Sequence, residues 1–172
     1  MTVDFTQLDP GFVVKVQSLL NICQNKGYNF VPRMGFRSLE DENKFWRQSR
    51  PTSTVIAEIA KLRAENCDYL ADSLENVGPQ PTGKWETNTI GGLSWHNWGQ
   101  ALDVLCQNAD GSFIDNGDDP CYEFLSEQTS SLGMKTGLTF NDAGHIQMNP
   151  QEIPEIYTLK QVNDYFSEKN AK

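Results

Sequence analysis

The two histidines of this chain, His96 and His145, each lie in a short segment of residue types suited to metal binding. His96 belongs to the pattern S-x-H-x-x-G-x-A-x-D, which runs from Ser94 to Asp103, and His145 ends a D-x-x-H pattern that begins at Asp142. Two imidazoles and one carboxylate form the ligand set of a catalytic zinc site with an open fourth position. A chain that binds one ion through both segments must fold so that they meet, and this requirement constrains the fold more than any other feature.

The spacing of the ligands predicts the elements that carry them. His96 and Asp103 are seven positions apart, which suits a histidine in a loop and an aspartate on the strand that follows better than two ligands on one helical turn. The small residues Gly99 and Ala101 would let the backbone lie close to the metal. We expect His145 to complete the triad from a neighbouring strand.

This ligand set predicts a zinc hydrolase. Zinc lowers the pKa of a bound water to about 7, so that hydroxide is available near neutral pH. Asp142, three residues before His145 and across a predicted turn, would take the proton as this water attacks a carbonyl and return it to the leaving amine. Arg37 is the candidate for a positive side chain that stabilises the developing oxyanion.

Length and composition indicate a globular protein of one domain, or one domain with a short extension. The chain has 172 residues, of which 38% are hydrophobic, enough for a sizeable core. Its formal net charge of −9 disfavours nucleic acid and anionic membranes as partners. The sequence has no apolar run of about 20 residues and no basic segment with an apolar run at its N-terminus. We therefore expect no membrane anchor and no signal peptide, in a chain that is cytosolic, already processed or released by another route.

Cysteine spacing argues against a second kind of zinc site. The four cysteines are widely separated and form no C-x-x-C pair, as a zinc ribbon would require. Reduced, buried thiols are the favoured interpretation, and one or two disulfides in an oxidising compartment are the alternative. The residues are Cys23, Cys67, Cys106 and Cys121.

Hydrophobic periodicity predicts an α+β chain in which helices come first and a small sheet carries the site. Capping residues and glycines mark the helix ends. The predicted helices are 10–26, 38–48, 52–76, 120–132 and 159–168. The predicted strands are 28–36, 101–106, 138–140 and 145–148, the last two joined by a tight turn at 141–144. A long Gly- and Pro-containing loop, 77–93, leads into the His96 motif.

The two histidine motifs together resemble those of a known family. The S-x-H-x-x-G-x-A-x-D motif with a later D-x-x-H is similar to that of the zinc peptidases of the D-alanyl-D-alanine carboxypeptidase family. That family includes vancomycin-resistance dipeptidases and the L-alanyl-D-glutamate endopeptidases of phage endolysins. The segment from Gly35 to Ser38, followed by a helix with Phe45 and Trp46 and then Arg50, is similar to the family's G-[YF]-R-[ST] segment. The resemblance covers about residues 35–147.

The resemblance implies a fold, a cofactor and a role for each site residue. The implied fold is the small α+β fold shared by these peptidases and hedgehog signalling domains: a small antiparallel sheet that carries the zinc site, with helices around it, in a single peptidase domain over residues 1–172. The implied cofactor is Zn²⁺. The implied roles are zinc ligand for His96, Asp103 and His145, general acid/base for Asp142, oxyanion stabilisation or substrate orientation for Arg37, and substrate contact for Ser94.

Two departures from the family pattern point to its endopeptidase branch. The base is Asp142 where many relatives have glutamate, and Ala143 and Gly144 stand where they have tryptophan or proline before the second histidine. With no signal peptide and no wall-binding domain in view, the resemblance implies a small monomeric endolysin. Such a protein would stay in the host cytoplasm until a holin-made pore lets it reach the cell wall or periplasm.

Three functions remain open from sequence. The first is a peptidoglycan endopeptidase that cuts the L-Ala–D-Glu bond of the stem peptide. The second is a D-Ala-D-Ala carboxypeptidase or dipeptidase, and the third is a zinc-stabilised binding module that has lost catalysis. Asp142 and Arg37 argue against the third, because a structural site needs neither a base nor an oxyanion donor. The acidic segment 108–119 lacks EF-hand spacing and predicts a solvated turn rather than a calcium site.

Overall fold

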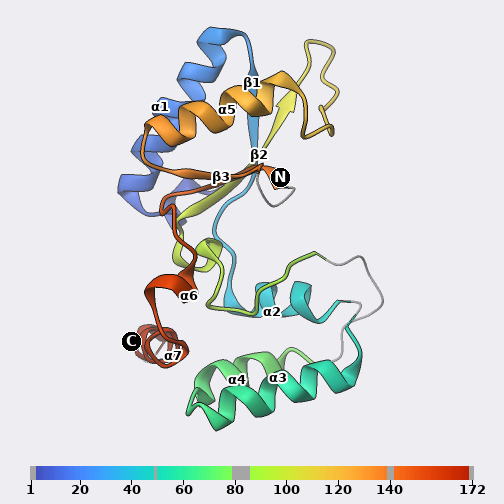
Figure 1. Ribbon diagram of the computed structural model, residues 1–172, viewed down its shortest axis with the longest axis vertical. Coiled ribbons are helices and arrows are strands. Elements are labelled where there is room, and N and C mark those ends of the chain that lie inside the picture. Colours follow the sequence, from blue (N-terminus) through green and yellow to red (C-terminus); the bar gives the residue numbers. More distant parts are fainter. Residues whose placement is uncertain (1–2, 49, 79–85, 139–141, 171–172) are drawn as a thin grey trace. The chain divides into compact units, whose positions relative to one another are not determined.

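The computed structural model describes residues 3–48, 50–78, 86–138 and 142–170. The chain forms two compact units, shown in Figure 1. The first, here called the sheet unit, comprises residues 1–36 and 98–150, and the second, the helical unit, comprises residues 37–97 and 151–172. A single peptidase domain over 1–172 stays a prediction.

The sheet unit is built on four antiparallel strands. They are β1 (Asn29–Met34), β2 (Ala101–Gln107), β3 (Lys135–Gly137) and β4 (Asp142–Gln147), in the spatial order β1-β2-β4-β3. The helices α1 (Pro10–Lys26) and α5 (Pro120–Ser131) pack on this sheet (Figure 1), and a short 3₁₀ helix, η1 (Phe5–Gln7), precedes α1. The predicted α+β class with a small antiparallel sheet is confirmed.

The first helix forms where its capping residues predicted it. The Asp9 side chain accepts a hydrogen bond from Phe12 N at 3.0 Å, Pro10 occupies the first turn, and Gly27 ends the helix with φ of 97°. A carboxylate N-cap and a left-handed glycine C-cap satisfy backbone groups that the helix itself leaves unpaired. The buried stripe of α1 consists of Phe12, Val16, Leu19 and Cys23.

Alternation along β2 and β4 gives the sheet two different faces. Leu102, Val104 and Ile146 are buried in the core with α1 and α5. The residues between them point to the opposite face, because successive side chains of a strand alternate. That second face carries Asp103 and His145, which are paired across the two strands.

The C-terminal part of the sheet differs from the prediction. A turn over 141–144 between strands 138–140 and 145–148 was wrong, since β3 ends at Gly137 and β4 already begins at Asp142. Residues 139–141 lie outside the described part of the chain. The strand can include Gly144 because this residue has no side chain: a Cβ built there would lie 2.2 Å from Val104 O. Only glycine lets β4 approach β2 this closely.

The helical unit contains α2 (Leu39–Arg47), α3 (Thr52–Ala64), α4 (Asp68–Asn76), α6 (Ile153–Ile156) and α7 (Leu159–Asn170). The 3₁₀ helix η2 (Trp95–Trp98) contains the boundary between the two units. Of the helices in the described ranges, none has the length and apolarity that crossing a membrane would require.

One long helix over 52–76 was also a wrong prediction, because α3 and α4 are separate. Asn66 adopts φ of 58°, the left-handed conformation. Asn66 N donates to Arg63 O at 3.0 Å and Cys67 N donates to Leu62 O at 2.9 Å. This pair of bonds is the Schellman ending of a helix, and asparagine is the residue after glycine that most readily adopts it.

Candidate metal centre

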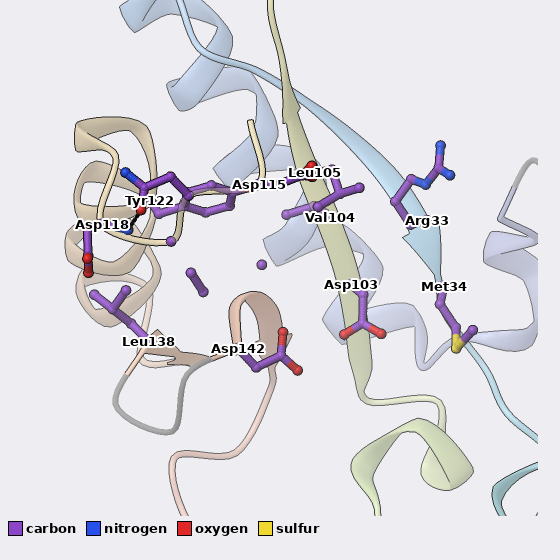
Figure 2. Close-up of a pocket in the computed structure, with 14 residues that line it drawn as sticks. Arg33, Met34, Asp103, Val104, Leu105, Asp115, Asp118, Tyr122, Leu138 and Asp142 are labelled. Carbon is purple, nitrogen blue, oxygen red and sulfur yellow. Dashed lines mark hydrogen bonds between the residues drawn. The ribbon is translucent and has the colours of Figure 1, made fainter. Parts of the chain in front are cut away.

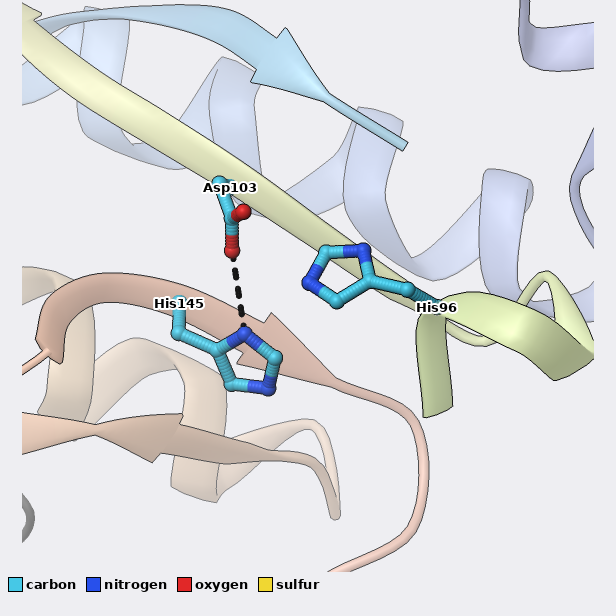
Figure 3. Close-up of side chains that lie close together, drawn as sticks. All are labelled: His96, Asp103 and His145. Carbon is cyan, nitrogen blue, oxygen red and sulfur yellow. Dashed lines mark hydrogen bonds and ion pairs between the residues drawn. The ribbon is translucent and has the colours of Figure 1, made fainter. Parts of the chain in front are cut away.

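The structure brings the three predicted metal ligands together. One ligand atom from each of His96, Asp103 and His145 lies within 4.8 Å of the other two. Figure 3 shows the three side chains facing a common space from η2, β2 and β4. A tetrahedral zinc ion with ligands at about 2.0–2.2 Å holds its ligand atoms roughly 3.3–3.6 Å apart. Within the described ranges this is the one group of three such residues.

His96 is buried and held in a tight turn. Its backbone N donates to the Ser94 hydroxyl at 3.4 Å, and its carbonyl accepts from Arg37 N at 3.2 Å. Gly99 follows with φ of 70°, and a Cβ there would lie 2.8 Å from Gln7 O. The glycine of the motif therefore serves the packing of the chain against the segment before α1, and its predicted part in the approach to a metal stays a prediction.

Asp103 and His145 form the most closely paired part of the cluster. Asp103 Oδ1 and His145 Nδ1 are 3.0 Å apart, and the side chains are 28% and 11% exposed. Burial lowers the pKa of the His145 imidazole, but the hydrogen bond to Asp103 and the charges of Asp103 and Asp142 outweigh burial, so that its pKa is raised. The hydrogen bond and the two negative charges therefore favour a positive charge between the Asp103 and His145 side chains.

The second ring nitrogen of His145 has a partner that the sequence patterns did not identify. His145 Nε2 lies 3.0 Å from Gln147 Oε1, and Gln147 Nε2 donates to Asn149 O at 2.9 Å. A backbone carbonyl only accepts hydrogen bonds, so the amide nitrogen of Gln147 must face Asn149 and its oxygen must face His145. When the imidazole is neutral, its proton is then on Nε2. Strand alternation could have identified this partner from the sequence, since Gln147 is two residues from His145 and shares its face of the strand.

In this tautomer the other ring nitrogen, Nδ1, needs a cation near it. With the proton on Nε2, His145 Nδ1 presents a lone pair to Asp103 Oδ1 at 3.0 Å. Two acceptors at this separation repel each other unless a cation lies between or beside them. A proton satisfies the pair, which is the physical meaning of the raised pKa, and a divalent metal ion bound also by His96 satisfies it with all three ligands.

Asp142 and Asp103 line the same cavity. It has a volume of about 770 Å³ and is bordered by β1, β2, β4 and the segment 115–118. In Figure 2 the two carboxylates face the same space from β4 and β2. Asp142 is exposed, and its charge contributes to the raised pKa of His145. The structure thus places the predicted base close to the ligand group and open to solvent.

Arg37 is firmly held within the helical unit. Its Nη1 donates to Glu42 Oε2 at 2.8 Å, and its guanidinium lies 5.0 Å from the centre of the Phe45 ring. Glu42 is fully buried and also accepts a hydrogen bond from the Thr87 hydroxyl at 2.8 Å. A buried carboxylate needs such partners. Sequence reasoning missed Glu42, because an acidic residue on a charged helix gives no sign that it is buried.

A buried asparagine links Arg37 to the turn that carries His96. Asn97 donates to Arg37 O at 2.9 Å and accepts from Gly92 N at 2.8 Å. Its side chain therefore ties the segment 92–97 to Arg37, which is 60 residues earlier in the chain. Loss of a buried amide of this kind removes a hydrogen bond from each of two backbone groups.

Comparisons with known proteins agree with the chemistry of this site. The sequence model of the family VanY, D-alanyl-D-alanine carboxypeptidase, matches residues 6–135, a stretch that includes His96 and Asp103. The peptidoglycan L-alanyl-D-glutamate endopeptidase CwlK of Bacillus subtilis (strain 168) is 26% identical over 156 residues, which are 84% of this chain and 75% of that protein.

Solved structures give more distant likenesses. The vancomycin-resistance D,D-pentapeptidase VanY of a VanB-type cassette, in complex with Zn(II), has a TM-score of 0.46 at 16% identity, over 90% of this chain and 83% of that chain. An L,D-carboxypeptidase, DacB from Streptococcus pneumonia, has a TM-score of 0.45 at 16% identity, over 94% of this chain and 72% of that chain.

Proposed function

Because the chain belongs to the VanY family of D-alanyl-D-alanine carboxypeptidases, we propose that it is a zinc-dependent peptidase that acts on the stem peptides of bacterial peptidoglycan. The observation that carries this proposal is the ligand group itself: one ligand atom from each of His96, Asp103 and His145 lies within 4.8 Å of the other two, and His145 Nδ1 is 3.0 Å from Asp103 Oδ1. A fold that sets these acceptors face to face fits a bound cation.

The three side chains suit zinc in number and kind. Two imidazole nitrogens and one carboxylate oxygen are borderline ligands that zinc prefers, and they leave a fourth position for water or substrate. A zinc ion held by His96, Asp103 and His145 would supply a Lewis acid and an activated water for attack on a peptide carbonyl. With the Asp103 charge counted, the group around the ion keeps a formal charge of about +1, which favours the developing oxyanion.

The remaining site residues have separate tasks. Asp142 takes the proton from the attacking water and gives it to the leaving amine, a role supported by its exposure and its place in the wall of the cavity. Arg37 stabilises the oxyanion or orients substrate. A guanidinium has five N–H donors, so its bond to Glu42 is compatible with this role. Ser94, whose hydroxyl accepts from His96 N, contacts substrate beside the ligand turn.

The scissile bond that we propose is the L-Ala–D-Glu bond. The similarity to CwlK, a peptidoglycan L-alanyl-D-glutamate endopeptidase, extends over 84% of this chain and supports an endopeptidase. The aspartate in the position of the base suits the same branch. The family description supports the other candidate, a carboxypeptidase that releases terminal D-Ala. The two candidates share the metal, the base and the hydrolytic chemistry.

The test is a digest of purified peptidoglycan with zinc-loaded protein, analysed by mass spectrometry. New amino termini at D-Glu that disappear after treatment with EDTA are the expected result. Release of D-Ala alone would transfer the protein to the carboxypeptidase candidate. The absence of any zinc-dependent product, with the Asp142→Asn variant as the matched control for contaminating activity, would contradict a peptidase acting on this substrate.

A further inference from the structure

We infer that Gln147 is a positioning residue, which selects Nδ1 of His145 as the metal-binding nitrogen by accepting the proton of Nε2. The inference rests on the proposed function only in that the site binds a metal ion. Gln147 is buried, at 2% exposure, and its amide oxygen lies 3.0 Å from His145 Nε2. Its amide contacts His145 and Asn149 O, so its effect on a bound ion would pass through the imidazole.

The orientation of the Gln147 amide is fixed from outside the site. Its nitrogen donates to Asn149 O at 2.9 Å, which leaves only the oxygen for His145. Turning the amide by half a rotation would set its oxygen against the Asn149 carbonyl, and two facing acceptors repel each other. The backbone after β4 thereby determines the protonation site of a ring two residues earlier.

Without this acceptor, the local electrostatics would favour the wrong tautomer. The Asp103 carboxylate lies 3.0 Å from His145 Nδ1 and attracts a proton to that nitrogen. A neutral imidazole protonated at Nδ1 has no lone pair there for a metal. Gln147 opposes this preference, because a proton moved to Nδ1 would leave two acceptors, Nε2 and the amide oxygen, facing each other.

A neutral acceptor is suited to a hydrolytic site. Acceptors that hold the second nitrogen of a metal-binding histidine are carboxylates, carbonyls or waters, and they commonly change metal affinity by about 10–100-fold. A carboxylate at this position would add a negative charge to a site that already contains Asp103 and Asp142. The amide of Gln147 fixes the ring while leaving the charge at the ion unchanged.

The first test uses the unmodified protein. It has only two histidines, so ¹⁵N NMR of the zinc-loaded protein should show two imidazole spin systems. We expect His145 to bear its proton on Nε2, with slow exchange against water, and to bind zinc through Nδ1. Coordination through Nε2 would overturn the inference without any variant. If the unmodified protein binds no zinc, the proposed function fails, and this outcome is separate from the assignment of the nitrogen.

The second test compares two substitutions by zinc affinity, measured by competition with a chromophoric chelator. Gln147→Met keeps the side-chain length and removes the acceptor, and it should weaken zinc binding about 10–100-fold and make the Nε2 proton exchange rapidly. Gln147→Glu keeps an acceptor for Nε2 but cannot donate to Asn149 O, and it should bind zinc at least as tightly as the parent, because a carboxylate partner raises the basicity of the ring.

A matched control and a structural readout complete the comparison. Gln107→Met removes an amide on β2 that bonds Gly111 O rather than a histidine, and it should leave zinc affinity unchanged. Urea unfolding of the zinc-free proteins shows whether each variant folds. If Gln147→Met binds zinc as well as the parent, or if both Gln147 variants lose zinc equally, Gln147 acts through packing or through Asn149, and the inference is wrong.

Discussion

The two faces of the β2–β4 strand pair have opposite compositions although their residues alternate along the same few positions. On one face, Leu102 and Ile146 are fully buried against α1 and α5. On the other, Asp103, His145 and Gln147 form a chain of polar contacts that ends at a backbone carbonyl. Stability and the candidate chemistry are therefore encoded by neighbouring residues with different tasks.

This alternation means that the register of β4 controls both properties at once. A shift of one residue would turn Ile146 toward the polar face and His145 into the core. The core face resists such a shift, because it would expose apolar surface and bury an imidazole without a partner. The core face thus holds the ligands in place, and substitutions on the two faces should have separable effects.

The largest expected effect is on the polar side, at the start of β4. Asp142→Asn removes the base but keeps the size of the side chain, and we expect kcat to fall by about 10²–10⁴-fold. Zinc content and the urea midpoint should stay close to those of the parent, because Asp142 is exposed. Hydrolysis rates on a stem peptide, together with metal analysis, check the prediction. A variant as active as the parent would show that another residue carries the proton.

On the core face the opposite pattern is expected. Ile146 is fully buried, and Ile146→Ala should lower the free energy of unfolding by about 2–5 kcal/mol through lost burial and a cavity. Ile146→Val is the control and should lower it by about 0.5–1.5 kcal/mol. Zinc affinity of the folded fraction should change little in either variant. A large loss of zinc affinity with little loss of stability would contradict the division between the faces.

Gly144 tests whether the spacing between β2 and β4 is as tight as the structure shows. A Cβ at this position would lie 2.2 Å from Val104 O, and the backbone cannot move away without disturbing the pair. Gly144→Ala should destabilise the protein by about 3 kcal/mol or slightly less and also weaken zinc binding, since His145 is the next residue. Gly11→Ala is the control, with its nearest neighbour at 3.2 Å. Equal urea midpoints for the two variants would argue against the close approach.

The sequence predicted those parts of the fold whose signals are local. The caps of α1 and the apolar stripe of that helix are encoded within a few residues, and they appear where expected. Asp103 and His145 could be assigned to neighbouring strands because residue type and spacing were informative. Their geometry was beyond prediction, because it depends on the register between strands distant in sequence.

Three features escaped the sequence for different physical reasons. The break between α3 and α4 depends on a left-handed Asn66, a conformation that an apolar stripe does not report. The burial of Glu42 is recognisable only from its contacts with Arg37 and Thr87, and Thr87 is 45 residues away in the chain. Gln147 has no motif of its own. Its importance follows from strand alternation once His145 is placed.

The smallest expected effect is on the pH dependence of stability, whose slope should have opposite signs in the zinc-free and the zinc-bound protein. In the zinc-free protein the pKa of His145 is raised, chiefly by Asp103 acting against the effect of burial. The folded state then binds a proton more tightly than the unfolded state does. The resulting stabilisation is fully present below the ordinary imidazole pKa of about 6.5 and is lost as pH rises through the folded-state pKa.

Zinc should reverse this trend. The ion needs the lone pair of His145 Nδ1, so protons compete with it, and zinc affinity should increase with pH over the window in which the zinc-free protein loses stability. Urea midpoints with and without zinc, at pH values from about 6 to about 9, check both slopes. Asp103→Asn is the control, since loss of the carboxylate should remove most of the pKa increase and flatten the zinc-free slope. Parallel slopes with and without zinc would mean that proton and metal occupy different places, and the polar face would then not be organised around a single cation.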